Sequence, residues 1–294
     1  MLRGLVSVVP AEDITAVVNT GDDIVLHGLN ISPDLDTVTY TLAAAIDPVQ
    51  GWGLEGETWN AMAALDRFGG QTWFRLGDRD LATHLYRTQR LSEGAGLDEV
   101  TGEIVGAWGL GLCVLPMTND RVETRVTLAD DGAEIGFQEY FVGRGHAVPV
   151  RSVRFCGVEQ ARPAPGVLDA IAIADRIVVC PSNPIVSIGP VLAVPGILDA
   201  IVTRRDDVVA VSPIIAGAAL KGPADRMLVE LGHEPSAVGV ARLYAPFAST
   251  LVIDVADEAL ADQVAAEGIR PVVVPTIMRD AETSAALARA VLAG

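Results

Sequence analysis

The second half of the chain alternates short apolar runs with longer segments of helical periodicity. The apolar runs are rich in Val and Ile, as is typical of buried strands, and they predict strands at residues 176–180, 208–212, 250–254 and 270–274. The segments around them predict helices at residues 166–174, 191–202, from 224 onward, 236–244, 257–267 and 281–292. Strands that are apolar throughout and separated by helices indicate a parallel sheet covered on both faces.

The first part of the chain is patterned differently. An apolar run at residues 14–18 predicts one more buried strand, and residues 37–46 have the composition of a helix. Residues 51–74 predict a further helix, on which Trp52 and Trp59 stand seven positions apart on one face. Such an aromatic face fits either a pocket for a flat ring or the core of the protein.

Residues 76–150 interrupt the alternation of strands and helices. A helix is predicted at residues 76–89, and Asp130–Gly132 between two alternating runs predicts a β-hairpin. We therefore predict an α/β fold with a three-layer, Rossmann-like, mostly parallel sheet. Residues 1–75 and 151–294 would form its nucleotide-binding core, and residues 76–150 an inserted α+β subdomain.

Composition limits the functions that this fold can carry. Half of the 294 residues are hydrophobic and the net charge is −17, so the surface repels nucleic acid and anionic lipid, and neither is an expected partner. Three scattered cysteines indicate free thiols in a reducing compartment. We expect a cytoplasmic protein, because the start of the chain does not resemble a signal peptide and Gly and Pro interrupt the most apolar window, residues 185–202.

Four carboxylates are concentrated in the segment that follows the first strand. Within residues 19–40, Asp22, Asp23, Asp34 and Asp36 occur without a single Lys or Arg. A divalent ion such as Mg²⁺ would neutralise them, because hard cations prefer oxygen ligands and often bridge carboxylates to a phosphorylated substrate. The alternative is structural, because Asp is also common at helix starts and in turns.

Polar residues follow other predicted strands as well. Ser182 and Asn183 come directly after residues 176–180, and Lys221 lies in the loop after residues 208–212. Because ligands bind outside the carboxyl ends of parallel strands, these residues and the acidic loop are expected around one crevice. The Ser182–Asn183 turn would cradle a phosphate or a base edge, or simply cap the next helix. The chain contains no nucleophile elbow, Walker A or zinc-protease motif.

Four longer segments carry a family resemblance. They are NTGDDIVLHGLNISPDLDT from residue 19, GDRDLATH from residue 77, PSNPIVSIGP from residue 181 and VSPIIAGAALKGPAD from residue 211. Together and in this order they resemble the 2-phospho-L-lactate transferases of coenzyme F(420) biosynthesis. The resemblance implies transfer of a phospholactyl or phosphoenolpyruvyl group from a guanosine diphosphate adduct to the deazaflavin Fo, with release of GMP and a requirement for Mg²⁺.

The resemblance also implies roles for individual residues. Asp22, Asp34 and Asp36 are the expected metal ligands and catalytic carboxylates, and Asp36 with Arg79 would contact Fo. Asn183 would hold the guanosine nucleotide, and His84 would orient substrate or cap a helix. The expected substrate-binding set is completed by Asn19, Thr20, Gly21, Thr37, Asp80, Ser182 and Ser212. Likeness to actinobacterial relatives favours the enolpyruvyl donor, and analogy with the family indicates a homodimer.

Two other functions stay open at this point. One is a non-catalytic nucleotide or deazaflavin binder, like the related nucleotide-sugar-binding regulators, and the other is a metal-dependent phosphohydrolase. In the family that the chain resembles, a strand and a glycine-rich GGxGGxR loop precede this region, whereas the chain begins MLRGL. We expect that the start was assigned too late; without those residues we expect weak activity and an uncovered strand edge.

Overall fold

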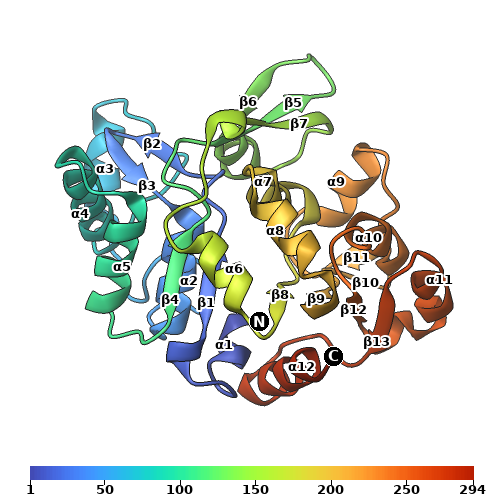
Figure 1. Ribbon diagram of the computed structural model, residues 1–294. Coiled ribbons are helices and arrows are strands. Elements are labelled where there is room, and N and C mark those ends of the chain that lie inside the picture. The colour runs from blue at the N-terminus through green and yellow to red at the C-terminus, as the bar shows by residue number, and fades with distance from the viewer.

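The computed structural model describes residues 1–294 and contains a four-stranded parallel sheet in the order β13–β12–β9–β8 (Figure 1). Its strands are β8 (Ile177–Val179), β9 (Val208–Val211), β12 (Thr250–Ile253) and β13 (Arg270–Val273). The helices around it are α6 (Val167–Ile173), α7 (Gly189–Ala193), α8 (Ile197–Thr203), α9 (Ala224–Glu230), α10 (Ala237–Tyr244), α11 (Ala261–Ala266) and α12 (Ala281–Ala293). Every residue of β9 and β12 is buried, so both faces are covered and neither strand alternates polar with apolar residues.

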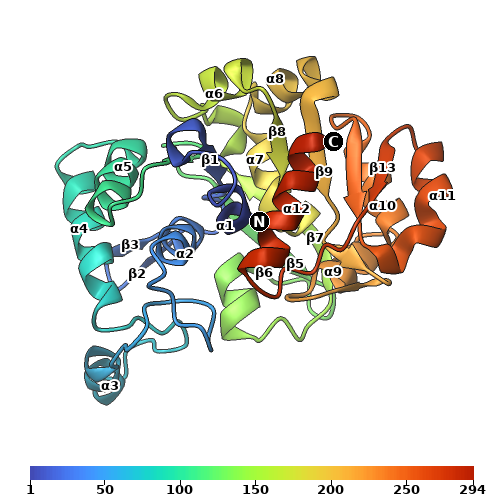
Figure 2. The same ribbon diagram turned by 90° about the horizontal axis from the view of Figure 1, so that it is seen from below.

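A second pair of parallel strands lies on the other side of β8 in Figure 1. It consists of β1 (Thr15–Val18) and β4 (Cys113–Pro116), and the elements near it are α1 (Leu2–Leu5), β2 (Ile24–Leu26), β3 (Leu29–Ile31), α2 (Pro33–Leu42) and α5 (Leu97–Ala107). β1 bonds only to β4 and β8 only to β9, so the parallel strands form two separate hydrogen-bonded sheets. α1 packs beside α12 (Figure 2). The predicted α/β class with mostly parallel strands is confirmed.

An antiparallel sheet in the order β6–β5–β7 stands apart from both parallel sheets. Its strands are β5 (Glu123–Leu128), β6 (Glu134–Gly136) and β7 (Val150–Cys156), and the predicted hairpin at Asp130–Gly132 joins β5 to β6. β5 alternates half-buried with buried residues, which fits a sheet packed on one face. One strand of the predicted subdomain, residues 76–150, pairs outside it: β4 bonds to β1, which belongs to the predicted core. The division of the chain into a core and an inserted subdomain stays a prediction.

Two predicted helices are broken in the structure. Residues 51–74 contain only α3 (Asn60–Arg67), because Gly51, Gly53 and Gly56 adopt φ angles of +72°, +68° and +72° in the loop before it. The rings of Trp52 and Trp59 nevertheless meet edge to face, with centroids 6.0 Å apart.

The predicted helix at residues 191–202 divides into α7 and α8, because Gly196 adopts a φ of +91° at the start of α8. No single helix is long and apolar enough to cross a membrane. One bent pair, Pro184–Ala193 with Ile197–Thr203, satisfies that criterion only when its two parts, 92° apart, are taken together.

A buried polar network fixes α4 (Asp80–Ser92) against α2 and β3. The guanidinium of Arg87, 2% exposed, forms a two-pronged ion pair with Asp36, in which Nη1 lies 3.1 Å from Oδ2 and Nη2 binds Oδ1. His84 lies beside both, with Nδ1 3.6 Å from Asp36 and Nε2 3.2 Å from Asp80. Tyr40 donates a 2.5 Å hydrogen bond to Asp80. Although burial opposes its charge, the carboxylate of Asp36 raises the pKa of Arg87 above its usual value.

This network corrects one premise drawn from the sequence. The acidic segment contains no cation of its own, but α4 brings Arg87 to Asp36 from 51 positions further along the chain. Asp36, Asp80 and His84 place possible metal-ligand atoms within 4.8 Å of one another, yet the guanidinium already supplies the positive charge there. Asp36 therefore needs no cation from outside the protein, whereas the other carboxylates of the segment still do.

We predict that Arg87→Met lowers the free energy of unfolding by about 3–5 kcal/mol, because it leaves the carboxylate of Asp36 buried without a partner. Combining it with Asp36→Asn should recover a large part of that loss, since the unpaired charge is then removed as well. Urea denaturation measures both variants. Arg90→Met, on the exposed side of the same helix, is the matched control. A loss from Arg87→Met no larger than that from Arg90→Met would contradict the assignment.

Candidate functional site

A cavity of about 720 Å³ opens where the carboxyl ends of the parallel strands meet. Asp22 reaches it from the loop after β1, Ser182 and Asn183 from the loop after β8, Ser212 from the end of β9, and Thr276 from the segment after β13. The structure thus brings the acidic loop and the loops after β8 and β9 around one crevice, as the strand order predicts.

Asp22 and Asp34 form the acidic side of this cavity. Asp34 lies in the first turn of α2, where Asn19 donates a 3.1 Å hydrogen bond to its Oδ2. Asp22 is 7% exposed, and its Oδ1 has no hydrogen-bond partner. Burial raises the pKa of Asp22 well above its usual value, and the nearby charge of Asp34 raises it further. Burial likewise raises the pKa of Asp34, although the bond from Asn19 opposes this shift.

This pair has the chemistry of a divalent-cation site. Two carboxylates that share a buried wall repel each other unless a proton or a cation lies between them. The unpartnered oxygen of Asp22 is a free ligand atom, and no Lys or Arg is within ion-pairing distance of either group. Mg²⁺ is commonly held by one or two carboxylates together with substrate phosphates. Asp22 and Asp34 therefore fit a Mg²⁺ ion.

The loops after β8 and β9 form a polar floor. The side-chain oxygen of Asn183 accepts hydrogen bonds from the backbone N–H groups of Ile185 and Val186, at 2.9 and 3.4 Å, so it caps the following turn. Its amide nitrogen makes only a 3.6 Å contact with the sulfur of Met227 and can still donate to a ligand. The hydroxyl of Ser212 is used within its own turn, where it donates to the carbonyl of Ile214 at 2.9 Å.

Aromatic side chains line another part of the cavity wall. They come from two separate segments: Trp52, Trp73 and Phe74 from the loops on either side of α3, and Phe137 and Phe141 from the chain after β6. The rings of Phe137 and Phe141 stack with centroids 5.5 Å apart. The sequence marked Trp52 and Trp59 as a possible ring-binding face; Trp52 lines the cavity and Trp59 does not, and the sequence gave no reason to place Phe141 at the site.

Several predicted site residues do not line this cavity. The amide nitrogen of Asn19 donates a hydrogen bond to Asp34, and its side-chain oxygen accepts one from the backbone N–H of Gly21 at 2.8 Å. Asn19 and Gly21 therefore shape the acidic loop. Thr37 does line it. Asp36, Asp80 and His84 belong to the network around Arg87. The side chain of Arg79 donates to the carbonyl of Glu55, and its backbone N–H to the carboxylate of Glu57. The substrate contacts expected of these residues stay predictions.

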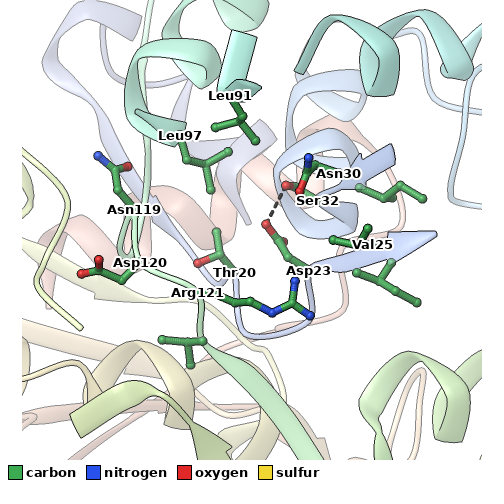
Figure 3. A pocket seen from close by; sticks show the side chains of 13 residues that line it. Thr20, Asp23, Val25, Asn30, Ser32, Leu91, Leu97, Asn119, Asp120 and Arg121 are labelled. Atoms are coloured by element: carbon green, nitrogen blue, oxygen red, sulfur yellow. Dashed lines mark hydrogen bonds between the residues drawn. The ribbon is translucent and has the colours of Figure 1, made fainter. Parts of the chain in front are cut away.

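A smaller pocket of about 160 Å³ lies on the other side of the acidic loop (Figure 3). Thr20 and Asp23 face it, so Asp22 and Asp23, although adjacent in the chain, line different pockets. Ser32 donates a 2.6 Å hydrogen bond to Asp23, shown as a dashed line in Figure 3. Burial raises the pKa of Asp23 to about 8, against the opposing effect of this bond. Asp23 is therefore bonded to Ser32 and does not line the larger cavity.

Comparison with known proteins places the chain in a family. The sequence profile described as 2-phospho-L-lactate transferase CofD matches residues 1–291. The chain is 47% identical over 297 residues to the phosphoenolpyruvate transferase of Kitasatospora aureofaciens, covering 99% of this chain and 92% of that protein. It is 44% identical over 283 residues to the phosphoenolpyruvate transferase of Mycolicibacterium smegmatis, covering 95% and 86%.

A solved structure shares the fold. It is a member of the UPF0052 family from Bacillus halodurans, which superposes with a TM-score of 0.61 at 16% identity, covering 99% of this chain and 95% of the other. At that identity the likeness concerns the fold alone. The profile match over nearly the whole sequence and the identities of 44–47% decide the family: the chain belongs to the 2-phospho-L-lactate transferase CofD family.

Proposed function

We propose that the protein transfers a phosphoenolpyruvyl group from a guanosine diphosphate adduct to the deazaflavin Fo, releasing GMP, in coenzyme F(420) biosynthesis. Membership of a transferase family supports group transfer. The observation that carries the proposal is that one cavity joins the carboxylate pair Asp22–Asp34 to a wall of aromatic rings. A phosphorylated donor and a flat acceptor need such surfaces side by side.

The acidic wall suits the reacting diphosphate. Asp22 and Asp34 would hold Mg²⁺, which, when bound, neutralises charge on the phosphate oxygens. In the transfer, the ribityl hydroxyl oxygen of Fo bonds to the distal phosphorus and the bond from that phosphorus to the bridging oxygen breaks, so that GMP leaves. The hydroxyl proton passes to one of the two carboxylates.

The remaining walls suit the other parts of the two substrates. The free amide nitrogen of Asn183 is available to the guanosine nucleotide. Trp52, Trp73 and Phe141 line the cavity and would supply aromatic surface to the deazaflavin ring. A volume of about 720 Å³ lies within the usual range for small-molecule sites. The enolpyruvyl donor is preferred over the lactyl donor because relatives at 44–47% identity carry the name phosphoenolpyruvate transferase.

Asp34→Asn tests the metal assignment. We predict that the Mg²⁺ concentration needed for half-maximal GMP formation rises by more than about tenfold, since loss of even an outer partner of a metal ligand has an effect of that size. The assay mixes Fo, the guanosine diphosphate adduct and Mg²⁺, and follows GMP and phosphorylated deazaflavin by mass spectrometry. Chelation of Mg²⁺ with EDTA should stop both products.

Asp206→Asn, which changes an exposed Asp outside the cavity, controls for the loss of one negative charge. An Asp34→Asn protein with the wild-type dependence on Mg²⁺ would contradict the assignment. GMP release without consumption of Fo would instead indicate a hydrolase.

Trp73→Ala tests the aromatic wall. We expect the KM for Fo to rise by about tenfold, within the range found when an aromatic partner of a stacked base is removed, while the KM for the donor stays constant. Steady-state kinetics with each substrate varied in turn separates the two constants. Phe68→Ala, at an 85% exposed site outside the cavity, is the control. Equal changes in both constants would show that Trp73 supports the cavity as a whole rather than the acceptor.

A further inference from the structure

Lys221 is the only lysine in the sequence, and its side chain lines the large cavity. It has no carboxylate within ion-pairing distance and no hydrogen-bond partner in the protein. The side chain of Lys221 is exposed. An unpaired cation beside a ligand cavity is available for an anion that arrives with the ligand.

The loop that carries Lys221 follows an anchored hairpin. It follows the short hairpin of β10 (Ile214–Ile215) and β11 (Ala218–Ala219), and it precedes α9. At the hairpin turn, the backbone N–H of Ala216 lies 3.1 Å from both carboxylate oxygens of Asp257, a 5% exposed residue. Gly222, with a φ of +70°, then turns the chain toward the helix. Lys221 therefore lies on a short exposed loop between this hairpin and α9, beside the cavity.

The tip of Lys221 reaches the aromatic side of the cavity. A Cβ atom added to Gly51 would lie 3.7 Å from the lysine Nζ, and the next residue, Trp52, lines the cavity. The other cation on the wall, Arg75, has its guanidinium 4.0 Å from the ring centroid of Trp59, so a π-face already occupies it. Lys221 is thus the cation on this wall that no protein group engages.

We propose that Lys221 binds the carboxylate of the three-carbon acid unit that the enzyme transfers. This inference rests on the proposed function. The diphosphate is assigned to the acidic side, where Asp22 and Asp34 with their metal ion would take it, and the same two acids would repel a carboxylate. The carboxylate of the adduct needs a separate cation, and Lys221 offers a charge-assisted hydrogen bond toward the acceptor side of the cavity. Lactyl and enolpyruvyl units both carry this carboxylate, so Lys221 selects acids over neutral units.

The single lysine makes a direct binding test possible. Reductive dimethylation with ¹³C-formaldehyde labels Lys221 and the amine of Met1 only, and keeps both positively charged. The Met1 amine, which lies near Cys180 and is not among the groups that line the cavity, is the second labelled site and gives a separate resonance. The probes are the lactate adduct of guanosine diphosphate and its carboxamide, each added with Mg²⁺. We expect the NMR resonance of Lys221 to shift with the acid and to stay constant with the carboxamide, while calorimetry verifies that both compounds bind.

Each outcome of this titration has a distinct meaning. If the acid binds and the Lys221 resonance does not move, or if the carboxamide moves it equally, the inference is wrong while the proposed function can stand. If the acid shifts Lys221 but Fo and the adduct give no GMP, the lysine assignment holds and the proposed function fails. If neither probe binds, both are overturned.

Kinetics provide a second, independent readout. We expect Lys221→Met to lower kcat/KM for the acid donor by about 10- to 100-fold, the effect of losing one charge-assisted hydrogen bond, and Lys221→Arg to recover part of it. With the carboxamide donor, Lys221→Met and wild type should be equally active. Arg162→Met removes an exposed positive charge outside the cavity and should behave as wild type. A Lys221→Met protein that loses activity equally on both donors would contradict the carboxylate assignment.

Discussion

The structure depends on how a cluster of buried and half-buried carboxylates is neutralised. The segment after β1 carries four Asp residues, and the protein supplies only one closely paired cation, the guanidinium of Arg87, which it gives to Asp36. Ser32 holds Asp23 on the far side of the loop. Asp22 and Asp34 share a wall of the large cavity without a positive partner. Charge that is buried without a partner is costly. The excess of carboxylates over cations therefore makes the cavity suited to a metal-bound phosphorylated substrate.

The parallel strands determine where these unneutralised carboxylates lie. Because β1, β8, β9 and β13 end at the same cavity, the loops after them converge on it. The chain after β6 adds Phe137 and Phe141 to the wall, and the buried face of the antiparallel sheet shares a core with Val186 and Met227 next to the polar floor. Phe137 and the loop after β8 are therefore positioned by a common core.

Much of this arrangement follows from the sequence, for identifiable reasons. The central strands β9 and β12 are buried on both faces, so the apolar runs of the four-stranded sheet stand out clearly, and the order of strands and helices then implies the crevice. The contact between Asp36 and Arg87 could not be foreseen, because it joins residues 51 positions apart through the packing of α4 on α2. The opposite directions of Asp22 and Asp23 depend on the turn of one loop. The loop at residues 51–58 was mistaken for helix because three of its glycines adopt positive φ angles, which composition alone does not reveal.

The central claim is that the unpaired carboxylates Asp22 and Asp34, and not the cluster of Asp36, Asp80 and His84, hold the metal ion. Crystals grown with Mn²⁺ and the guanosine diphosphate adduct would test it directly, because anomalous scattering locates manganese without reference to the protein structure. We predict an anomalous peak within coordination distance of Asp22 and Asp34. A peak beside His84, or a bound adduct with no peak at the Asp22–Asp34 wall, would contradict this account of the site.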